Sequence, residues 1–333
     1  LDKILQKKLF IVVCFFARST SYIAMLNHWT IGLSWLSKNR FLSKCYKNSF
    51  NTLLRDFTTK SYCSNIFFDN LNFTGINIMI SRTGWTPSPF DARDYPFNRA
   101  DVVDTSVRSL ILEHPFPARN QQSVPCCVSC AVVVCMEIID TRNPPQIALS
   151  SLFHYYLTRP NPNSLVDLTL RDGLRSAVLN GICSLASHNQ NFDRPGAMIN
   201  PTNVAKQEAF AQRLVAINPI TEQAEYYILS DYNRKESWRK ALRIGMPILL
   251  GFWATSSYFS LSASNAVLRP SSNSNSNSGH AAVVIGFDDN REMFLVKDSR
   301  GTDFGTQGHW WLSYEAAESR LVVEAWAIGK ISY

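Results

Sequence analysis

The chain has 333 residues, of which 46% are hydrophobic and 18% are charged. This composition excludes an intrinsically disordered chain and allows one large domain or two smaller ones. The formal net charge of +7 does not indicate a nucleic-acid partner, because residues 1–80 hold 10 of the 33 basic residues and 3 of the 26 acidic ones. The remainder of the chain is therefore electrically balanced.

Residues 1–80 are predicted to be an N-terminal extension that precedes one domain over residues 81–333. The stretch Leu9–Ala17 follows two lysines and resembles the apolar core of a secretory signal, and it is too short to span a bilayer. If residues 1–21 are a signal, the protein is secreted or lysosomal and Asn72 opens a glycosylation sequon; otherwise it is cytoplasmic. The competing interpretation is that the ordered protein starts near Met79, so the localisation stays open.

The domain is predicted to begin with an ordered, proline-rich loop over residues 84–96. Pro125 suits the first turn of a helix, and the segment that follows is apolar on almost every side, which indicates a buried helix. Helices are predicted over Cys126–Ile139, Leu149–Tyr156, Leu170–Asn180 and Lys235–Ile244, and strands over Ile248–Trp253, Ala281–Phe287, Met293–Lys297, His309–Ser313 and Leu321–Ile328. Helices first and strands later predict an α+β protein. The Ser/Asn tract 271–278 is predicted to be a flexible loop.

Four of the eight cysteines, Cys126, Cys127, Cys130 and Cys135, fall within ten residues. Such bunching does not favour a disulfide scaffold, because neighbours on one short helix do not easily reach disulfide geometry. Cys127 is predicted to lie in the first turn of the helix, where the helix dipole and a nearby imidazolium both favour the thiolate. Taken alone, Cys127 would still be interpreted as one more buried packing residue.

Two other residues change that interpretation. Gln121 precedes Cys127 by six residues, so its side-chain amide can fold back beside the Cys127 N–H and give two donors for an oxyanion. His280 opens the apolar run Ala281–Ile285 and so lies at the end of a strand. Each of them alone is more often structural, but the combination predicts a thiol acyl-transfer site.

The segments Asn120–Cys127, Gly279–Ala281 and Asp298–His309 resemble, in that order, three motifs of the papain-like cysteine peptidases: N-Q-G-x-x-G-S-C, G-H-A and N-S-W-G-x-x-W-G-x-x-G-Y. The resemblance extends from about Gly84 to the C-terminus and is closest to the branch without a cysteine at the place of Val124. It implies a two-lobed fold, with a helical lobe, an antiparallel β-barrel-like lobe and a cleft between them. It also implies a peptide or protein substrate and neither a cofactor nor a metal, and we expect a monomer.

By this resemblance Cys127 would be the nucleophile, His280 the general base and later the acid, and Gln121 the oxyanion donor. Asp298 replaces the usual asparagine and would orient the imidazole, since a carboxylate can accept a hydrogen bond from the imidazole N–H. The resemblance thus predicts a cysteine-type peptidase that works through a thioester.

The chain departs from the family pattern at Gln122, Pro125, Val128 and Arg300. Arg300 stands where the family has a tryptophan, and its guanidinium could pair with Asp298 and divert it from His280. The other three could narrow the cleft or loosen the loop of Gln121. A catalytically inactive, peptide-binding relative is therefore the alternative. A redox or zinc pair at Cys127 and Cys130 is disfavoured, because no second pair of ligands lies at a suitable spacing.

Overall fold

The structure is a computed structural model that describes residues 84–97, 104–140, 147–188, 191–215, 226–229, 233–270 and 278–329. The contacts of the chain divide it into two compact units, Leu1–Met79 and Ile80–Tyr333, and every described residue belongs to the second unit. The N-terminal extension expected over residues 1–80, with its signal-like stretch and the Asn72 sequon, lies outside the described residues. The same holds for nearly all of the Ser/Asn tract.

The described residues form one eight-stranded sheet with the order β2-β8-β3-β5-β6-β7-β4, and β1 pairs with β5 beside this path. The strands are β1 (Ser109–Ile111), β2 (Tyr226–Ile228), β3 (Ile248–Trp253), β4 (Val267–Leu268), β5 (Gly279–Asp288), β6 (Met293–Lys297), β7 (His309–Ser313) and β8 (Val322–Ile328). All pairs are antiparallel except β4 with β7. The expected α+β architecture, with a helical part and a sheet part, is confirmed. The sheet is open and mixed, not a closed barrel, because β2 and β4 form two edges that do not pair with each other.

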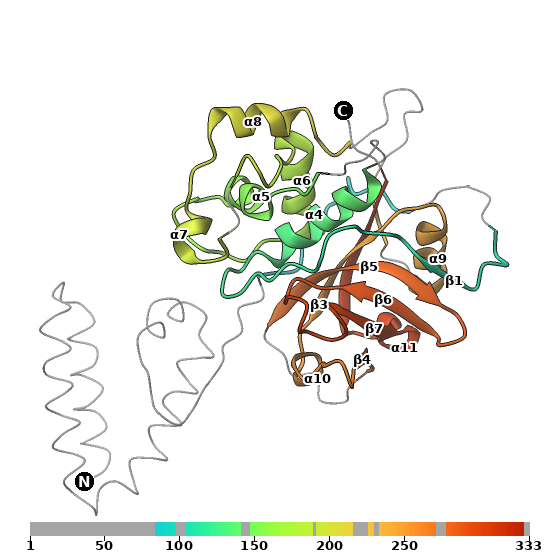
Figure 1. Cartoon of the computed structure of the whole chain (residues 1–333). Coiled ribbons are helices and arrows are strands. Elements are labelled where there is room, and N and C mark those ends of the chain that lie inside the picture. The colour runs from blue at the N-terminus through green and yellow to red at the C-terminus, as the bar shows by residue number, and fades with distance from the viewer. Residues whose placement is uncertain are drawn as a thin grey trace, which may run out of the picture. The chain divides into compact units, whose positions relative to one another are not determined.

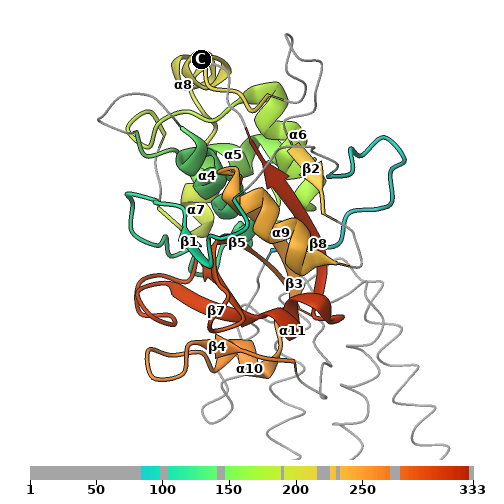
Figure 2. The same cartoon turned by 90° about the vertical axis from the view of Figure 1, so that its right-hand side faces the viewer.

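The helices are α4 (Cys127–Ile139), α5 (Ser151–Thr158), α6 (Leu170–Asn180), α7 (Arg194–Ala197), α8 (Asn203–Phe210), α9 (Arg234–Arg243), α10 (Ser256–Phe259) and α11 (Tyr314–Glu318). Figure 1 shows α5 to α8 gathered on the side of α4 that faces away from the sheet, and α9 packs on β3 and β5 (Figure 2). Side-chain caps explain where several of them begin: Ser150, Thr169 and Asn233 each accept a hydrogen bond from a main-chain N–H of the first turn. No helix within the described ranges is long and apolar enough to cross a membrane.

The sheet is buried on both faces. Along β5, Ala281 and Val283 pack into the core of the helical lobe, whereas Ala282 and Val284 pack into a second core under α9 and α11. Alternate residues of a strand point to opposite faces, so both sets must be apolar. For this reason the sequence of β5 is a continuous apolar run, and its polar residues lie only at its two ends.

One buried acidic residue ties the loop before α4 to the helix. Glu137, on α4, is 2% exposed and accepts hydrogen bonds from both terminal nitrogens of Arg119 at 2.9 and 2.5 Å. The His114 Nε2 lies 2.8 Å from Glu137 Oε2, and the main-chain N–H of Leu149 donates to Oε1 at 2.8 Å. The loop over residues 114–119 is thereby held against α4, and it leads directly to Gln121.

We expect Glu137→Ala to lower the free energy of unfolding by about 3–5 kcal/mol, because it leaves the Arg119 guanidinium buried without its carboxylate. Glu236→Ala is the matched control, since Glu236 pairs with Arg239 at the surface and its side chain is 54% exposed. The control should change stability by less than about 1 kcal/mol. Urea denaturation measures both, and equal losses in the two variants would contradict the structural role assigned to Glu137.

Candidate active site

Cys127 is the first residue of α4 and is fully buried. Burial, with added repulsion from Asp167 and Cys130, raises the pKa of the Cys127 thiol well above its usual value, while a hydrogen bond from the main-chain N–H of Ala281 works in the opposite direction. Ala281 directly follows His280 in β5. The fold therefore brings the start of α4 against the residue next to His280, as expected for a thiol and an imidazole on opposite walls of one site.

His280 faces Asp298, which directly follows β6. The Nε2 of His280 lies 2.9 Å from Asp298 Oδ1, and both side chains are fully buried. The other ring nitrogen, Nδ1, is buried and has no hydrogen-bond partner. Because a carboxylate accepts only, Nε2 carries the hydrogen, and in the neutral ring Nδ1 is then the basic nitrogen. This tautomer is the one that can take a proton from a thiol.

Asp298 accepts four hydrogen bonds. Besides His280, the main-chain N–H of Ser299 donates to Oδ1 at 2.7 Å, and Tyr258 and the Trp310 indole donate to Oδ2 at 3.0 and 2.8 Å. Burial alone would raise the pKa of Asp298, but the charge and hydrogen bond of His280, the hydrogen bond from Trp310 and the charge of Arg300 outweigh burial and lower it. The carboxylate therefore stays ionised beside the imidazole. Sequence reasoning missed Tyr258 and Trp310, since nothing in their local pattern marks them.

Arg300, which the sequence left as a possible direct partner of Asp298, reaches this carboxylate through the hydroxyl of Tyr258. Its Nε donates to the hydroxyl of Tyr258 at 3.0 Å. Its guanidinium lies over the rings of Phe259, Tyr258 and Phe304, with centroid distances of 4.9, 5.4 and 5.6 Å. Arg300 is thus held by aromatic faces and by one phenol.

Gln121 lies where the sequence placed it, before the start of α4, and is 3% exposed. Its Oε1 accepts from the Ser299 hydroxyl at 2.6 Å, and its Nε2 donates to the carbonyl of Val124 at 2.9 Å. The main-chain N–H of Gln121 also donates to the carbonyl of Ser299 at 2.8 Å. Gln121 is therefore fastened to the residue after Asp298, and its amide nitrogen points toward the turn that leads to Cys127.

The departures at Gln122 and Val128 are each accommodated. Gln122 has φ 50°, which is the left-handed region that favours glycine. Its main-chain N–H donates to the Asn120 side chain at 3.0 Å, which helps to hold this turn. Val128 is fully buried and packs against Gly173 of α6, where a Cβ would lie 2.8 Å from Val128 Cγ1.

Residues 84–86 cross from one wall of the site to the other. Their main chain bonds to Leu168, with Thr86 N to Leu168 O and Leu168 N to Gly84 O both at 3.0 Å. A Cβ on Gly84 would lie 2.3 Å from the Pro125 carbonyl carbon, and a Cβ on Gly279 would lie 2.4 Å from the Trp85 carbonyl oxygen. Trp85 is 1% exposed and packs on Gly279, the residue before His280. The segment thus lies beside Pro125, two residues before Cys127, and beside Gly279, the residue before His280. Cys127 and His280 are both fully buried.

The other described cysteines take no comparable position. The Sγ atoms of Cys126 and Cys130 lie 3.8 Å apart, and all five described cysteines are free thiols. A hydrogen bond from Cys126 lowers the pKa of Cys130, but Cys130 lies one turn into the buried helix and not at its N-terminus, where it lines a small space together with Ala281 and Asp298. Within the described ranges no three His, Cys, Asp or Glu side chains lie together as metal ligands would.

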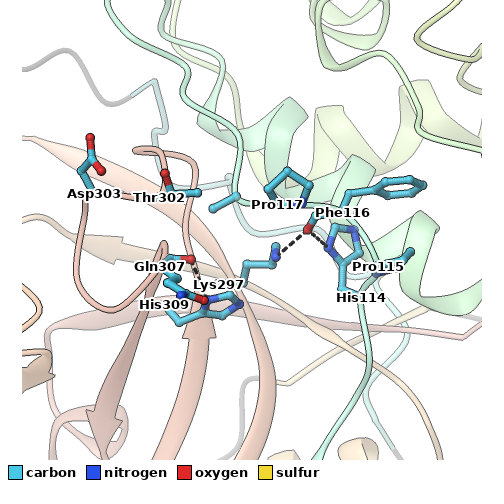
Figure 3. Close-up of a pocket in the computed structure, with 10 residues that line it drawn as sticks. His114, Pro115, Phe116, Pro117, Lys297, Thr302, Asp303, Gln307 and His309 are labelled. Carbon is cyan, nitrogen blue, oxygen red and sulfur yellow. Dashed lines mark hydrogen bonds between the residues drawn. The ribbon is translucent and has the colours of Figure 1, made fainter.

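A separate cavity of about 560 Å³ lies behind this site, between the loop over residues 114–118 and the loop after β6. Figure 3 shows Lys297 reaching across it to the carbonyl of Phe116, a hydrogen bond of 3.0 Å, with His114 and His309 at its sides. Burial and the charge of Arg119 lower the pKa of Lys297 to about 8. The cavity is lined by neither Cys127 nor His280, so it is not part of the site. The hydrogen bond from Lys297 across the cavity helps to hold the loop before Gln121.

Comparison with known proteins gives a consistent result. A family model described as the Peptidase_C39 like family matches residues 115–322. An uncharacterized peptidase C1-like protein of Acanthamoeba polyphaga mimivirus is 28% identical over 189 residues, which cover 55% of this chain. The match spans 59% of the length of that relative.

Among solved structures, xylellain, a cysteine protease from Xylella fastidiosa, is 21% identical and superposes with a TM-score of 0.63, covering 75% of this chain and 96% of xylellain. A digestive procathepsin proteinase from the larval midgut of Tenebrio molitor is 17% identical, with a TM-score of 0.61 and coverage of 98% and 99%. At these identities the likeness shows that the fold is papain-like.

We expect Gln122→Gly to raise the free energy of unfolding by about 0.5–1 kcal/mol, because glycine removes the left-handed strain at a smaller entropic cost. Gln207→Gly is the control, since Gln207 is exposed on α8 and glycine there should cost about 1 kcal/mol. Denaturation midpoints give both values. A loss of stability in Gln122→Gly would show that its side chain contributes more than its backbone costs.

Removing the Trp85 side chain should open the packing on Gly279, next to His280, and so give a reagent access to Cys127. We expect Trp85→Ala to raise the rate of iodoacetamide alkylation at Cys127 at least about tenfold, since reaction of a thiol requires access and escape from apolar burial. Phe90→Ala is the control, because Phe90 belongs to the same loop and is 94% exposed. Peptide mapping by mass spectrometry locates the alkylated thiol, and thermal melting checks that both variants fold. Equal rates in the wild type and Trp85→Ala would contradict the covering role of Trp85.

Proposed function

Because the chain belongs to the Peptidase_C39 like family, we propose that it is a cysteine-type peptidase that hydrolyses peptide bonds through a thioester on Cys127. The observation that carries the proposal is the arrangement around His280. One ring nitrogen is held by Asp298 at 2.9 Å, the other is unbonded, and the next main-chain N–H reaches the Cys127 sulfur. A base held in one tautomer beside a thiol at a helix N-terminus is suited to acyl transfer.

In the first half of the proposed reaction, His280 Nδ1 takes the thiol proton and the Cys127 sulfur attacks the substrate carbonyl carbon. The carbonyl π electrons move to its oxygen, which then accepts hydrogen bonds from the Gln121 amide and the Cys127 N–H. When the tetrahedral intermediate collapses, the C–N bond breaks and His280 gives its proton to the leaving amine. The acyl group remains on sulfur as a thioester.

In the second half, His280 takes a proton from water, and the resulting hydroxide attacks the thioester carbonyl. The C–S bond breaks, the peptide leaves with a new carboxyl group, and Cys127 recovers its proton. Asp298 keeps its charge throughout and stabilises the imidazolium that forms twice in the cycle. Gln121 serves both tetrahedral intermediates, and its bond from Ser299 sets the orientation of the amide.

The alternative of an inactive, peptide-binding protein would need no ionised partner for His280. Burying an ionised carboxylate costs desolvation free energy even with four donors, and an inactive protein gives no reason for that cost. This alternative therefore has less support. One chain supplies every group in the proposed mechanism, and we accordingly infer that a monomer acting on a peptide or protein substrate is sufficient.

Replacing the nucleophile gives the direct test. In a peptidase assay on a mixture of peptides, Cys127→Ala should reduce hydrolysis at least about 1,000-fold, because no other group can form the acyl intermediate. Cys130→Ala, one turn along the same buried helix, should keep activity within about threefold of the wild type. The proposal is wrong if Cys130→Ala abolishes hydrolysis while Cys127→Ala retains it.

A further inference from the structure

The carboxylate of Asp298 is separated from a cation by a single hydroxyl group. Tyr258, on α10, donates its O–H to Asp298 Oδ2 at 3.0 Å and accepts a hydrogen bond from Arg300 Nε at 3.0 Å. The three groups form a chain from guanidinium to phenol to carboxylate, and it continues to His280 through Asp298 Oδ1 at 2.9 Å. Every hydrogen in this chain points toward the carboxylate.

The ring of Tyr258 is as fixed as its hydroxyl. It is fully buried and lies 5.1 Å from the ring of Phe252 and 5.3 Å from that of His280, measured between centroids. The ring of Phe304 lies 5.2 Å from it on another side. With its ring held in this way, the phenol oxygen cannot swing away from either Arg300 or Asp298.

Without this hydroxyl, Oδ2 of Asp298 would lose a donor and Nε of Arg300 would lose this acceptor. A guanidinium and a carboxylate oxygen that no longer share a bridging hydroxyl attract each other strongly in a low-dielectric interior. A direct, bidentate pair is the geometry that arginine prefers with a carboxylate. Forming it would turn the carboxylate toward Arg300 and away from His280 Nε2.

We propose that Tyr258 is a positioning residue: it keeps Arg300 from pairing directly with Asp298 and so leaves Asp298 to hold His280. Arg300 then supports the site through the phenol, since donating to the hydroxyl oxygen polarises the O–H that Asp298 accepts. This inference rests on the proposed peptidase function, because it concerns the residue that would orient the base. It also explains how a chain with arginine at position 300 keeps its His280–Asp298 pair.

The test uses the full chain and three variants. Tyr258→Phe should lower kcat about tenfold with KM within about twofold, because it removes one hydrogen bond to a charged group and the hydroxyl that stands between Arg300 and Asp298. The double variant Tyr258→Phe with Arg300→Met should recover most of that loss, to within about threefold of the wild type, since no cation remains to capture Asp298. A purely structural role for Tyr258 predicts that the second substitution makes the protein worse.

Tyr314→Phe is the matched control. Tyr314 is also mostly buried, and its hydroxyl donates to a carboxylate, Asp289 Oδ1, at 2.7 Å, in the second core of the sheet lobe. It should lose stability in thermal melting but keep kcat within about twofold. The inference is overturned if Tyr258→Phe keeps the kcat of the wild type, if Tyr314→Phe loses as much, or if the double variant is no better than Tyr258→Phe.

A second readout does not depend on peptide hydrolysis. The rate of Cys127 alkylation against pH reports the thiolate, which the imidazolium of His280 stabilises. In Tyr258→Phe the inflection should move to higher pH, because a diverted Asp298 stabilises the imidazolium less, and the double variant should move it back. If the wild type hydrolyses no peptide while these shifts occur, the proposed function fails and the role of Tyr258 stands. If hydrolysis occurs but no shift does, the role of Tyr258 fails alone.

Discussion

The carboxylate of Asp298 is the group on which the geometry of the site depends. A buried, ionised carboxylate is tolerated only when hydrogen-bond donors reach its oxygens. Asp298 accepts from four donors, which lie on α10, β5 and β7 and on the main chain of the next residue, Ser299. Each of those donors is thereby given a fixed place. His280 is one of them, so satisfying a desolvation requirement also selects the tautomer of the imidazole.

The wall that carries Cys127 and Gln121 is held by a second buried carboxylate. Glu137 forms hydrogen bonds with Arg119, His114 and the main-chain N–H of Leu149. These bonds hold the loop that ends at Gln121. The two systems meet where Gln121 and Ser299 exchange a main-chain and a side-chain hydrogen bond. The wall that carries Cys127 and the wall that carries His280 are therefore held in register by two polar networks, which set the distance between them.

Much of the fold could be predicted from the sequence, and the reasons are local. The predicted bounds of α6, β3, β6 and β7 agree with the structure, and those of α4, α5, α9, β5 and β8 differ by one or two residues at one or both ends. These segments are either continuous apolar runs or have a clear apolar period, and most have a cap or a turn beside them. The missed elements are mostly short: α7, α10, α11, β1, β2 and β4 have two to five residues, too few for any period to emerge. Helix α8 has eight residues, but the sequence did not predict it, because its polar and apolar residues follow no clear pattern.

Some residues of the candidate site could likewise be predicted from the sequence, and others could not. Spacing and the motif resemblance were enough to select Cys127, His280, Asp298 and Gln121, because residue type and order are properties of the chain itself. The sequence could not place Tyr258 or Trp310 beside Asp298, or Trp85 beside Gly279, since these partners lie 12 to 194 residues apart along the chain. It also left open whether Arg300 pairs with Asp298, because two residues of separation say nothing about which way a side chain turns. Only the folded packing of Tyr258, on α10, between Arg300 and Asp298 decided that the guanidinium reaches the carboxylate through a phenol.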